Sequence, residues 1–183
     1  MALKATIFKA IIQVADIDRG YYREHTLTLA RHPSETDARM MIRLLAFALH
    51  ASDTLQFTRG LSTQDEPDLW QKSLTDDIDT WIDLGLPETK RLRKACGRAR
   101  QVFLYCYGGH SVQLWWEQNQ STLCRHKNLS IIDLPKEATE NLASFAQKHM
   151  RMEFTIQDDH ILVSDGQNSA GVDLTFLQKA VGG

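Results

Sequence analysis

The chain has 183 residues, of which 43% are hydrophobic and 24% are charged. This composition is typical of globular proteins, and the length suits one domain with its own core, so we expect a single domain over residues 1–183. The net charge of −2 argues against a polycation that binds nucleic acid through its overall field. Contact with nucleic acid would have to come from a local basic surface.

Neither the cysteines nor the hydropathy pattern indicates export or membrane insertion. Cys96, Cys106 and Cys124 are odd in number and form no CxxC or zinc-type spacing, so we expect no disulfide framework. The first residues lack the apolar core of a signal peptide, and no stretch approaches the roughly 20 apolar residues that span a bilayer. We therefore expect a cytoplasmic protein with no membrane partner.

The first 60 residues predict a long β-hairpin followed by a helix. Apolar and β-branched residues over 3–14 and 21–29 favour two strands, and the turn residues 16–20 join them. A helix is expected from about 35 to 51 because apolar residues recur there at helical spacing. Ser34 is the predicted N-cap, and Glu35 would lie in the first turn.

The rest of the chain alternates between strands and helices. The expected elements are strands 55–58, 68–73 and 79–84 with a polar loop 60–66, helix 88–98, strand 101–107, helix 111–125, strand 129–134, helix 136–150, and a second hairpin over 152–156 and 161–164. No repeat or linker interrupts this series. The order predicts the α/β class, with one mixed central sheet flanked by helices.

Two acids on neighbouring predicted strands suit a metal site. Mg²⁺ takes hard oxygen ligands, commonly one or two carboxylates with waters and a substrate phosphate. Asp68 follows Pro67, a residue confined to strand edges, bulges or strand starts, and Asp83 lies on the next strand. Glu35 could supply a third oxygen. Mg²⁺, or Mn²⁺ in its place, would polarise a phosphodiester and activate a water.

A simpler interpretation of these acids stays open. Several other carboxylates crowd the same region, namely Asp65, Glu66, Asp76, Asp77 and Asp79. Glu35 could serve only the positive end of a helix dipole. Residue types and spacing alone do not separate a metal site from an acidic loop.

The helix predicted over 88–98 carries a series of cations. Lys90, Lys94 and Arg98 fall on one side at four-residue spacing, and Arg91 and Arg93 flank them. Phosphates are natural partners for such a stripe, and its place directly after the Asp83 strand would bring a lysine within reach of a bound phosphate. The alternative is a solvated helix face whose side chains cover the sheet.

Other chemistry finds less support. The seven histidines show no HxxxH or HxH spacing, and the chain contains no GxSxG, GxGxxG or GxxxxGK[ST]. The four tryptophans could stack on bases, although large aromatics in or beside strands are more often core residues.

Five segments together resemble the bacterial YaeQ family. They are Arg31-His32-Pro33-Ser34-Glu35-Thr36, Arg39-Met40-Met41, Phe57-Thr58-Arg59-Gly60-Leu61-Ser62, Glu66-Pro67-Asp68-Leu69-Trp70 and Arg91-Leu92-Arg93-Lys94-Ala95. The resemblance runs the length of the chain. It implies a variant of the PD-(D/E)XK nuclease core, a sheet flanked by helices, here preceded by the N-terminal β-hairpin.

Carried onto this sequence, the nuclease pattern places its helical acid at Glu35, its proline and aspartate at Pro67 and Asp68, and its second acid at Asp83. The lysine of the pattern should then occupy position 85, where this chain has Gly85. The resemblance leaves two outcomes: a lysine moved to the next helix, or a descendant without catalysis.

Two functions follow as expectations. The first is a Mg²⁺-dependent phosphodiesterase acting on DNA or RNA, with Asp68, Asp83 and Lys94 or Lys90 as catalytic residues. Its metal ligands would be Glu35, Asp68 and Asp83, and its phosphate contacts Arg91, Arg93 and Arg98. The second is a catalytically inactive module of the same fold that binds nucleic acid or a protein partner. Carboxylates tied up in salt bridges would favour the second.

Overall fold

The structure is a computed structural model that describes residues 4–59 and 65–182. By their internal contacts, the residues divide into two compact units. Unit 1 comprises residues 1–51 and 137–173, and unit 2 comprises residues 52–136 and 174–183. Each unit is therefore built from two separate stretches of the chain.

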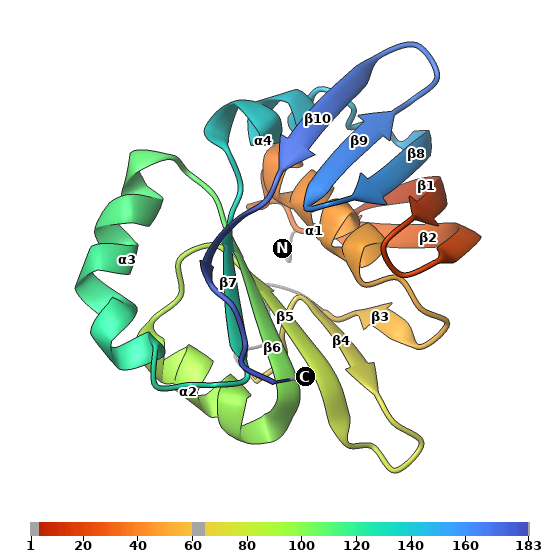
Figure 1. The fold of residues 1–183 in the computed structure, drawn as a ribbon. Coiled ribbons are helices and arrows are strands. Elements are labelled where there is room, and N and C mark those ends of the chain that lie inside the picture. Colours follow the sequence, from red (N-terminus) through yellow and green to blue (C-terminus); the bar gives the residue numbers. More distant parts are fainter. Residues whose placement is uncertain (1–3, 60–64, 183) are drawn as a thin grey trace. The chain divides into compact units, whose positions relative to one another are not determined.

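Unit 1 is organised around a five-stranded mixed sheet, with the order β10-β9-β8-β1-β2 (Figure 1). Its elements are β1 (Thr6–Asp16), β2 (Tyr21–Arg31), α1 (Asp37–Leu49), β8 (His149–Gln157), β9 (His160–Ser164) and β10 (Ser169–Asp173). The predicted N-terminal hairpin is confirmed as β1 and β2. It is the edge of a larger sheet, because β1 also pairs in parallel with β8.

The second predicted hairpin is confirmed as β8 and β9. Asp158 and Asp159 both have positive φ, 52° and 61°, which is the conformation of a two-residue type I′ turn. The backbone N–H of Asp158 donates to Asp18 Oδ2 at 2.9 Å. Alternate residues of β8 are buried, so one face of the strand contributes to the core of unit 1.

Unit 2 contains a six-stranded mixed sheet, with the order β11-β7-β6-β5-β4-β3. Its strands are β3 (Leu55–Phe57), β4 (Leu69–Lys72), β5 (Ile78–Leu84), β6 (Ala99–Cys106), β7 (Leu129–Asp133) and β11 (Thr175–Gln178). Strands β3, β4 and β5 are antiparallel, whereas β5, β6 and β7 are parallel. The crossovers between the parallel strands are α2 (Thr89–Arg98) and α3 (His110–Leu123).

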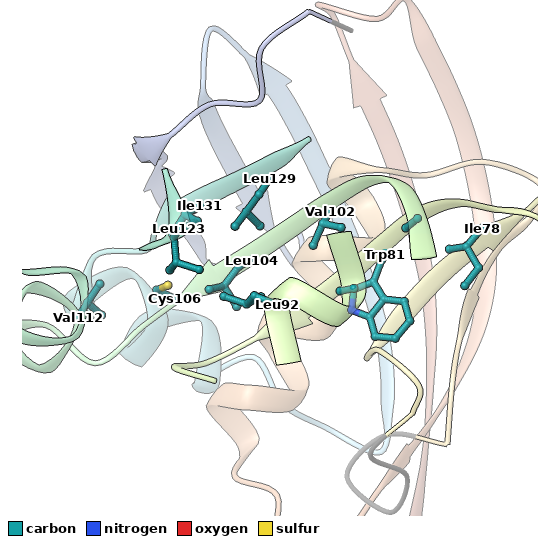
Figure 2. Packing of buried hydrophobic residues seen from close by; sticks show 12 residues of the cluster. Ile78, Trp81, Leu92, Val102, Leu104, Cys106, Val112, Leu123, Leu129 and Ile131 are labelled. Atoms are coloured by element: carbon teal, nitrogen blue, oxygen red, sulfur yellow. The ribbon is translucent and has the colours of Figure 1, made fainter. Parts of the chain in front are cut away.

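The core of unit 2 lies between α2, α3 and one face of this sheet. Buried residues from both helices and from β5, β6 and β7 form one apolar cluster. Figure 2 shows its side chains in a row from Val112 of α3 to Ile78 of β5, with Trp81 and Leu92 between β5 and α2. This packing fixes α2 against the strand that carries Asp83.

The α/β class is confirmed, but the prediction of one central sheet is wrong. The strands form two sheets, and the hairpins predicted at the two ends of the chain come together in the first of them. Strands β10 and β11 were not predicted. Both are short: β10 buries only Ala170 and Val172, and β11 has no fully buried residue.

The helix predicted over 136–150 is shorter, because α4 spans only Lys136–Ala143. Beyond it the N–H groups of residues 144–146 bond three residues back, and Ser144 Oγ donates to Asn141 O at 2.6 Å. A buried series with period two then begins at Met150, and it defines β8 in place of more helix.

Cys96, Cys106 and Cys124 are free thiols, and burial raises the pKa of Cys96 to about 11. No helix in the part of the chain that the structure describes is both long and apolar enough to cross a membrane. Most of the predicted loop over 60–66 lies outside the described residues.

Candidate nucleic-acid interface

Helix α2 buries one narrow side and exposes its cations. It begins after Glu88, whose extended backbone forms the N-cap, and Pro87 precedes this cap. Only Leu92 and Ala95 are buried, and both belong to the core cluster of unit 2. Cys96 packs against the same cluster, whereas Lys90, Arg93, Lys94 and Arg98 are exposed, so the amphipathic pattern explains why these cations form a surface.

Asp83 is one of the most deeply buried charged groups, with 1% of its surface exposed. Its Oδ2 accepts hydrogen bonds from Arg91 Nε at 2.9 Å and from the Trp81 indole Nε1 at 3.0 Å. Its Oδ1 accepts from Arg91 Nη2, also at 2.9 Å. The pairing is thus bidentate, which is the strong geometry for a guanidinium and a carboxylate.

Arg91 also joins α2 to the segment before β4. Its Nη2 donates to the backbone oxygen of Glu66 at 2.8 Å, and Arg98 Nη1 donates to the oxygen of Asp65 at the same distance. The Arg98 guanidinium also lies 5.2 Å from the centre of the Trp81 ring. Two predicted phosphate contacts, Arg91 and Arg98, therefore bind groups of their own chain.

Asp68 is brought to the same end of β5 as Asp83. Its backbone N–H donates to Ile82 O at 2.9 Å, and its Oδ2 accepts from the N–H of Leu84, the residue after Asp83, at 3.0 Å. Thr58 Oγ1 donates to the oxygen of Pro67 and fixes the approach to this position. With 5% of its surface exposed, Asp68 connects the start of β4 to the end of β5.

Gly85 occupies the position where the nuclease pattern has lysine. Its φ of +98° is rarely adopted by residues with a side chain, and its N–H donates to Tyr105 O at 2.9 Å. A Cβ at this position would meet no other atom within 4 Å. Backbone conformation, rather than lack of space, therefore accounts for glycine here.

A hollow of about 500 Å³ opens beside the first turns of α2, lined by Asp65, Trp81, Pro87, Glu88, Lys90, Arg91 and Lys94. We call it the α2 pocket. Lys94 Nζ pairs there with the Asp65 carboxylate, and the hydrogen bond and charge of Lys94 lower the pKa of Asp65. The side chains of this pair are 58% and 75% exposed, so water screens their attraction.

Lys90 and Arg93 complete the exposed face of α2. Together with Lys94 they follow the i, i+3, i+4 pattern of neighbours on a helix surface. Among residues 4–59 and 65–182, neither Lys90 nor Arg93 has a carboxylate within ion-pair distance. Both are exposed, so their ammonium and guanidinium groups are available to an anion in solution.

Glu35 belongs to unit 1, whereas Asp68 and Asp83 belong to unit 2. It is buried, and its carboxylate binds Arg39 Nη1 at 2.9 Å and Arg43 Nη2 at 2.5 Å. The expected cap is also corrected, because α1 begins at Asp37 and Thr36 Oγ1 accepts from the N–H of Arg39. Glu35 therefore precedes the helix, and two arginines of α1 neutralise its charge.

The predicted metal ligands do not fit Mg²⁺ in the arrangement that the structure has. Mg²⁺ requires near-octahedral oxygen ligands, but both oxygens of Asp83 already accept hydrogen bonds from a guanidinium that would repel a cation. Within the described ranges, no group of three or more His, Cys, Asp or Glu residues is placed to hold a metal ion. The roles predicted for Glu35, Asp68 and Asp83 as ligands stay predictions.

Sequence reasoning missed several residues of the α2 pocket. The alternation of the strand places Trp81 on the same face as Asp83, but large aromatics in or beside strands are more often core residues, so the pattern does not assign it to the site. Asp65 and Lys94 are separated by 29 positions, and no local pattern indicates that they pair. The predicted cations Lys90, Arg91 and Lys94 do come together in one pocket.

Taken together, these features define an α/β protein with two mixed sheets and a cationic helix that begins at the carboxyl end of a parallel strand. The family model described as "YaeQ protein" matches residues 1–174. The chain belongs to the YaeQ family. It is 48% identical over 179 residues to "Uncharacterized protein YaeQ" of Escherichia coli (strain K12), covering 98% of this chain and 99% of that protein.

Two solved structures are similar over nearly the whole chain. The crystal structure of YaeQ protein from Xanthomonas axonopodis pv. citri has a TM-score of 0.92 and 47% sequence identity, covering 95% of this chain and 98% of the other. The crystal structure of YaeQ protein from Pseudomonas syringae also has a TM-score of 0.92, with 35% identity and coverage of 97% and 98%.

Proposed function

We propose that this protein binds the phosphate backbone of nucleic acid at the α2 pocket, as a module of nuclease-type fold that does not require catalysis. The observation that carries the proposal is the bidentate Arg91–Asp83 pair. In this pair the Arg91 guanidinium binds both carboxylate oxygens of Asp83, which a metal ion would need as ligands. Lys90, Arg93 and Lys94 remain exposed on the same helix.

The partners of the cations decide which of them can contact phosphate. Moving Arg91 away would leave Asp83 buried without its counter-charge, at a cost of about 3–5 kcal/mol. The Lys94–Asp65 pair is exposed and water screens its attraction, so a phosphate can replace Asp65 at little cost. Within the described part of the chain, Lys90 and Arg93 have no ion pair to break. Phosphate therefore belongs at Lys90, Arg93 and Lys94, with Arg91 as the support beneath them.

The nuclease ancestry is part of this proposal. The element order of unit 2 supports it: an antiparallel hairpin, β4–β5, has Asp68 at its start and Asp83 near its end, and a crossover helix leads to the parallel strand β6. Gly85 and the Arg91–Asp83 pair replace the lysine and the open carboxylate of the nuclease pattern. Cleavage with Mg²⁺ or Mn²⁺ stays an alternative proposal that requires Arg91 to release Asp83.

The experiment compares oligonucleotide binding by the wild type and by the Lys90→Gln/Lys94→Gln variant. Fluorescence anisotropy is measured over a range of salt concentrations. We expect wild-type affinity to fall with salt, and the double variant to lose about 1 to 2 from the slope of log K against log salt, since each phosphate contact on a single strand contributes about 0.7.

Lys127→Gln is the matched control. Lys127 is exposed and belongs to unit 2, but it precedes β7 and so lies at the amino end of the parallel strands, opposite the start of α2. The control should bind like the wild type. Absence of binding at low salt, or equal loss in the control, contradicts the proposal. Cleavage that requires Mg²⁺ or Mn²⁺ and is abolished by Asp83→Asn would support the alternative.

A further inference from the structure

A second hollow adjoins the α2 pocket and shares part of its wall. It has a volume of about 410 Å³ and is lined by Leu86, Thr89, Trp115 and Asn119, together with the residues that also line the first pocket, Pro87, Glu88 and Lys90. Lys90 therefore stands between a cationic hollow and one with an aromatic wall.

Trp115 of α3 is held in a fixed orientation. Its indole Nε1 donates to the backbone oxygen of Pro87 at 3.0 Å, and its ring packs against the apolar cluster of unit 2 while remaining partly exposed. Asn119 follows one turn later and donates from Nδ2 to the backbone oxygen of Trp115 at 2.7 Å. An aromatic face already fixed in this way loses little conformational freedom on binding.

The other aromatic wall cannot serve the same purpose. Trp81 lines the α2 pocket but is only 2% exposed, and its indole N–H is bound to Asp83. Arg98 lies over its ring. Of the residues that line the two hollows, Trp115 is thus the one that offers an aromatic surface to a planar group.

We infer that the two hollows together bind a single strand, with a phosphate at Lys90 and Lys94 and an unpaired base stacked on Trp115. This inference rests on the proposed function, and it adds the class of nucleic acid. Bases in a duplex are stacked on each other, whereas single strands can turn bases out onto aromatic side chains. The side-chain amide of Asn119, in the same hollow, can contact a base edge.

The test uses three probes: a short oligodeoxythymidine, the same backbone with abasic sites, and a duplex with a matched number of phosphates. We expect the wild type to bind the thymidine strand at least about 10-fold more tightly than the abasic strand, because stacking on one aromatic side chain has an effect of this order. Trp115→Leu should reduce thymidine binding to the abasic level and leave abasic binding unchanged.

Trp115→Phe separates stacking from a structural effect. It keeps an aromatic face but lacks the N–H that binds Pro87, so it should retain most of the preference for the thymidine strand. Unchanged affinity for the abasic strand shows that the phosphate site of each variant is intact. Equal wild-type binding of all three probes, with salt dependence, would overturn the inference and leave the proposed function standing. No salt-dependent binding of any probe would overturn the proposed function itself.

Discussion

Arg91 differs from the neighbouring cations of α2 because its partner carboxylate is buried. Its guanidinium bonds both oxygens of Asp83, a side chain with 2% exposure, and also the backbone of Glu66. Lys94 has an exposed partner, and Lys90 and Arg93 are solvated. Four cations within five residues thus have different roles because their surroundings differ in burial. The sequence shows the cations but not these partners.

The buried pair predicts a specific pattern of stabilities. Arg91→Met should lower the free energy of unfolding by about 3–5 kcal/mol, because it leaves the Asp83 charge buried and unpaired. Adding Asp83→Asn removes that charge, so the double variant should be more stable than Arg91→Met alone. Urea unfolding followed by circular dichroism measures both quantities.

Arg93→Met serves as the control, since its side chain is exposed and a change there should stay within about 0.5 kcal/mol. If the effects of Arg91→Met and Asp83→Asn add without coupling, the pair does not have the structural role assigned to it.

Among the elements, α2 and the turn before it determine where the site lies. Glycine at the end of β5 and proline before the helix reverse the chain so that α2 returns along β5 with Arg91 over Asp83. The sequence pattern predicted the bounds of β5 and of α2 to within one residue. It could not indicate that position 85 has a positive φ, because a Gly in an apolar series is compatible with several backbone conformations.

Two glycine substitutions near the site should have opposite effects. Gly85→Ala should destabilise the protein by about 1–2 kcal/mol, because a side chain is unfavourable at φ +98°. Gly97→Ala, within α2 and with open space for a Cβ, should stabilise it by about 0.5–1 kcal/mol. Thermal unfolding compares the two. A neutral or stabilising Gly85→Ala would show that backbone conformation does not select glycine there.

Across the whole molecule, the sequence predicted most elements but not their assembly. Apolar residues that recur at every second position identify strands, and those that recur every three to four positions identify helices. Both patterns are local. Pairing of β1 with β8 joins residues about 140 positions apart, and no local pattern encodes it, so one sheet was predicted where there are two. The proximity of Asp83 to the cations of α2 follows from the sequence more directly, because β5 and α2 are consecutive in the chain.

Amide and indole NMR spectra during an oligonucleotide titration test most directly whether nucleic acid binds at the exposed face of α2. We predict the largest shifts at residues 88–94 and at the Trp115 indole N–H, with smaller shifts at the Trp81 indole, and with all of them reduced by added salt. Strands β9 and β10 should be unaffected. Shifts confined to residues outside α2 and α3, or no shifts at low salt, would contradict the account.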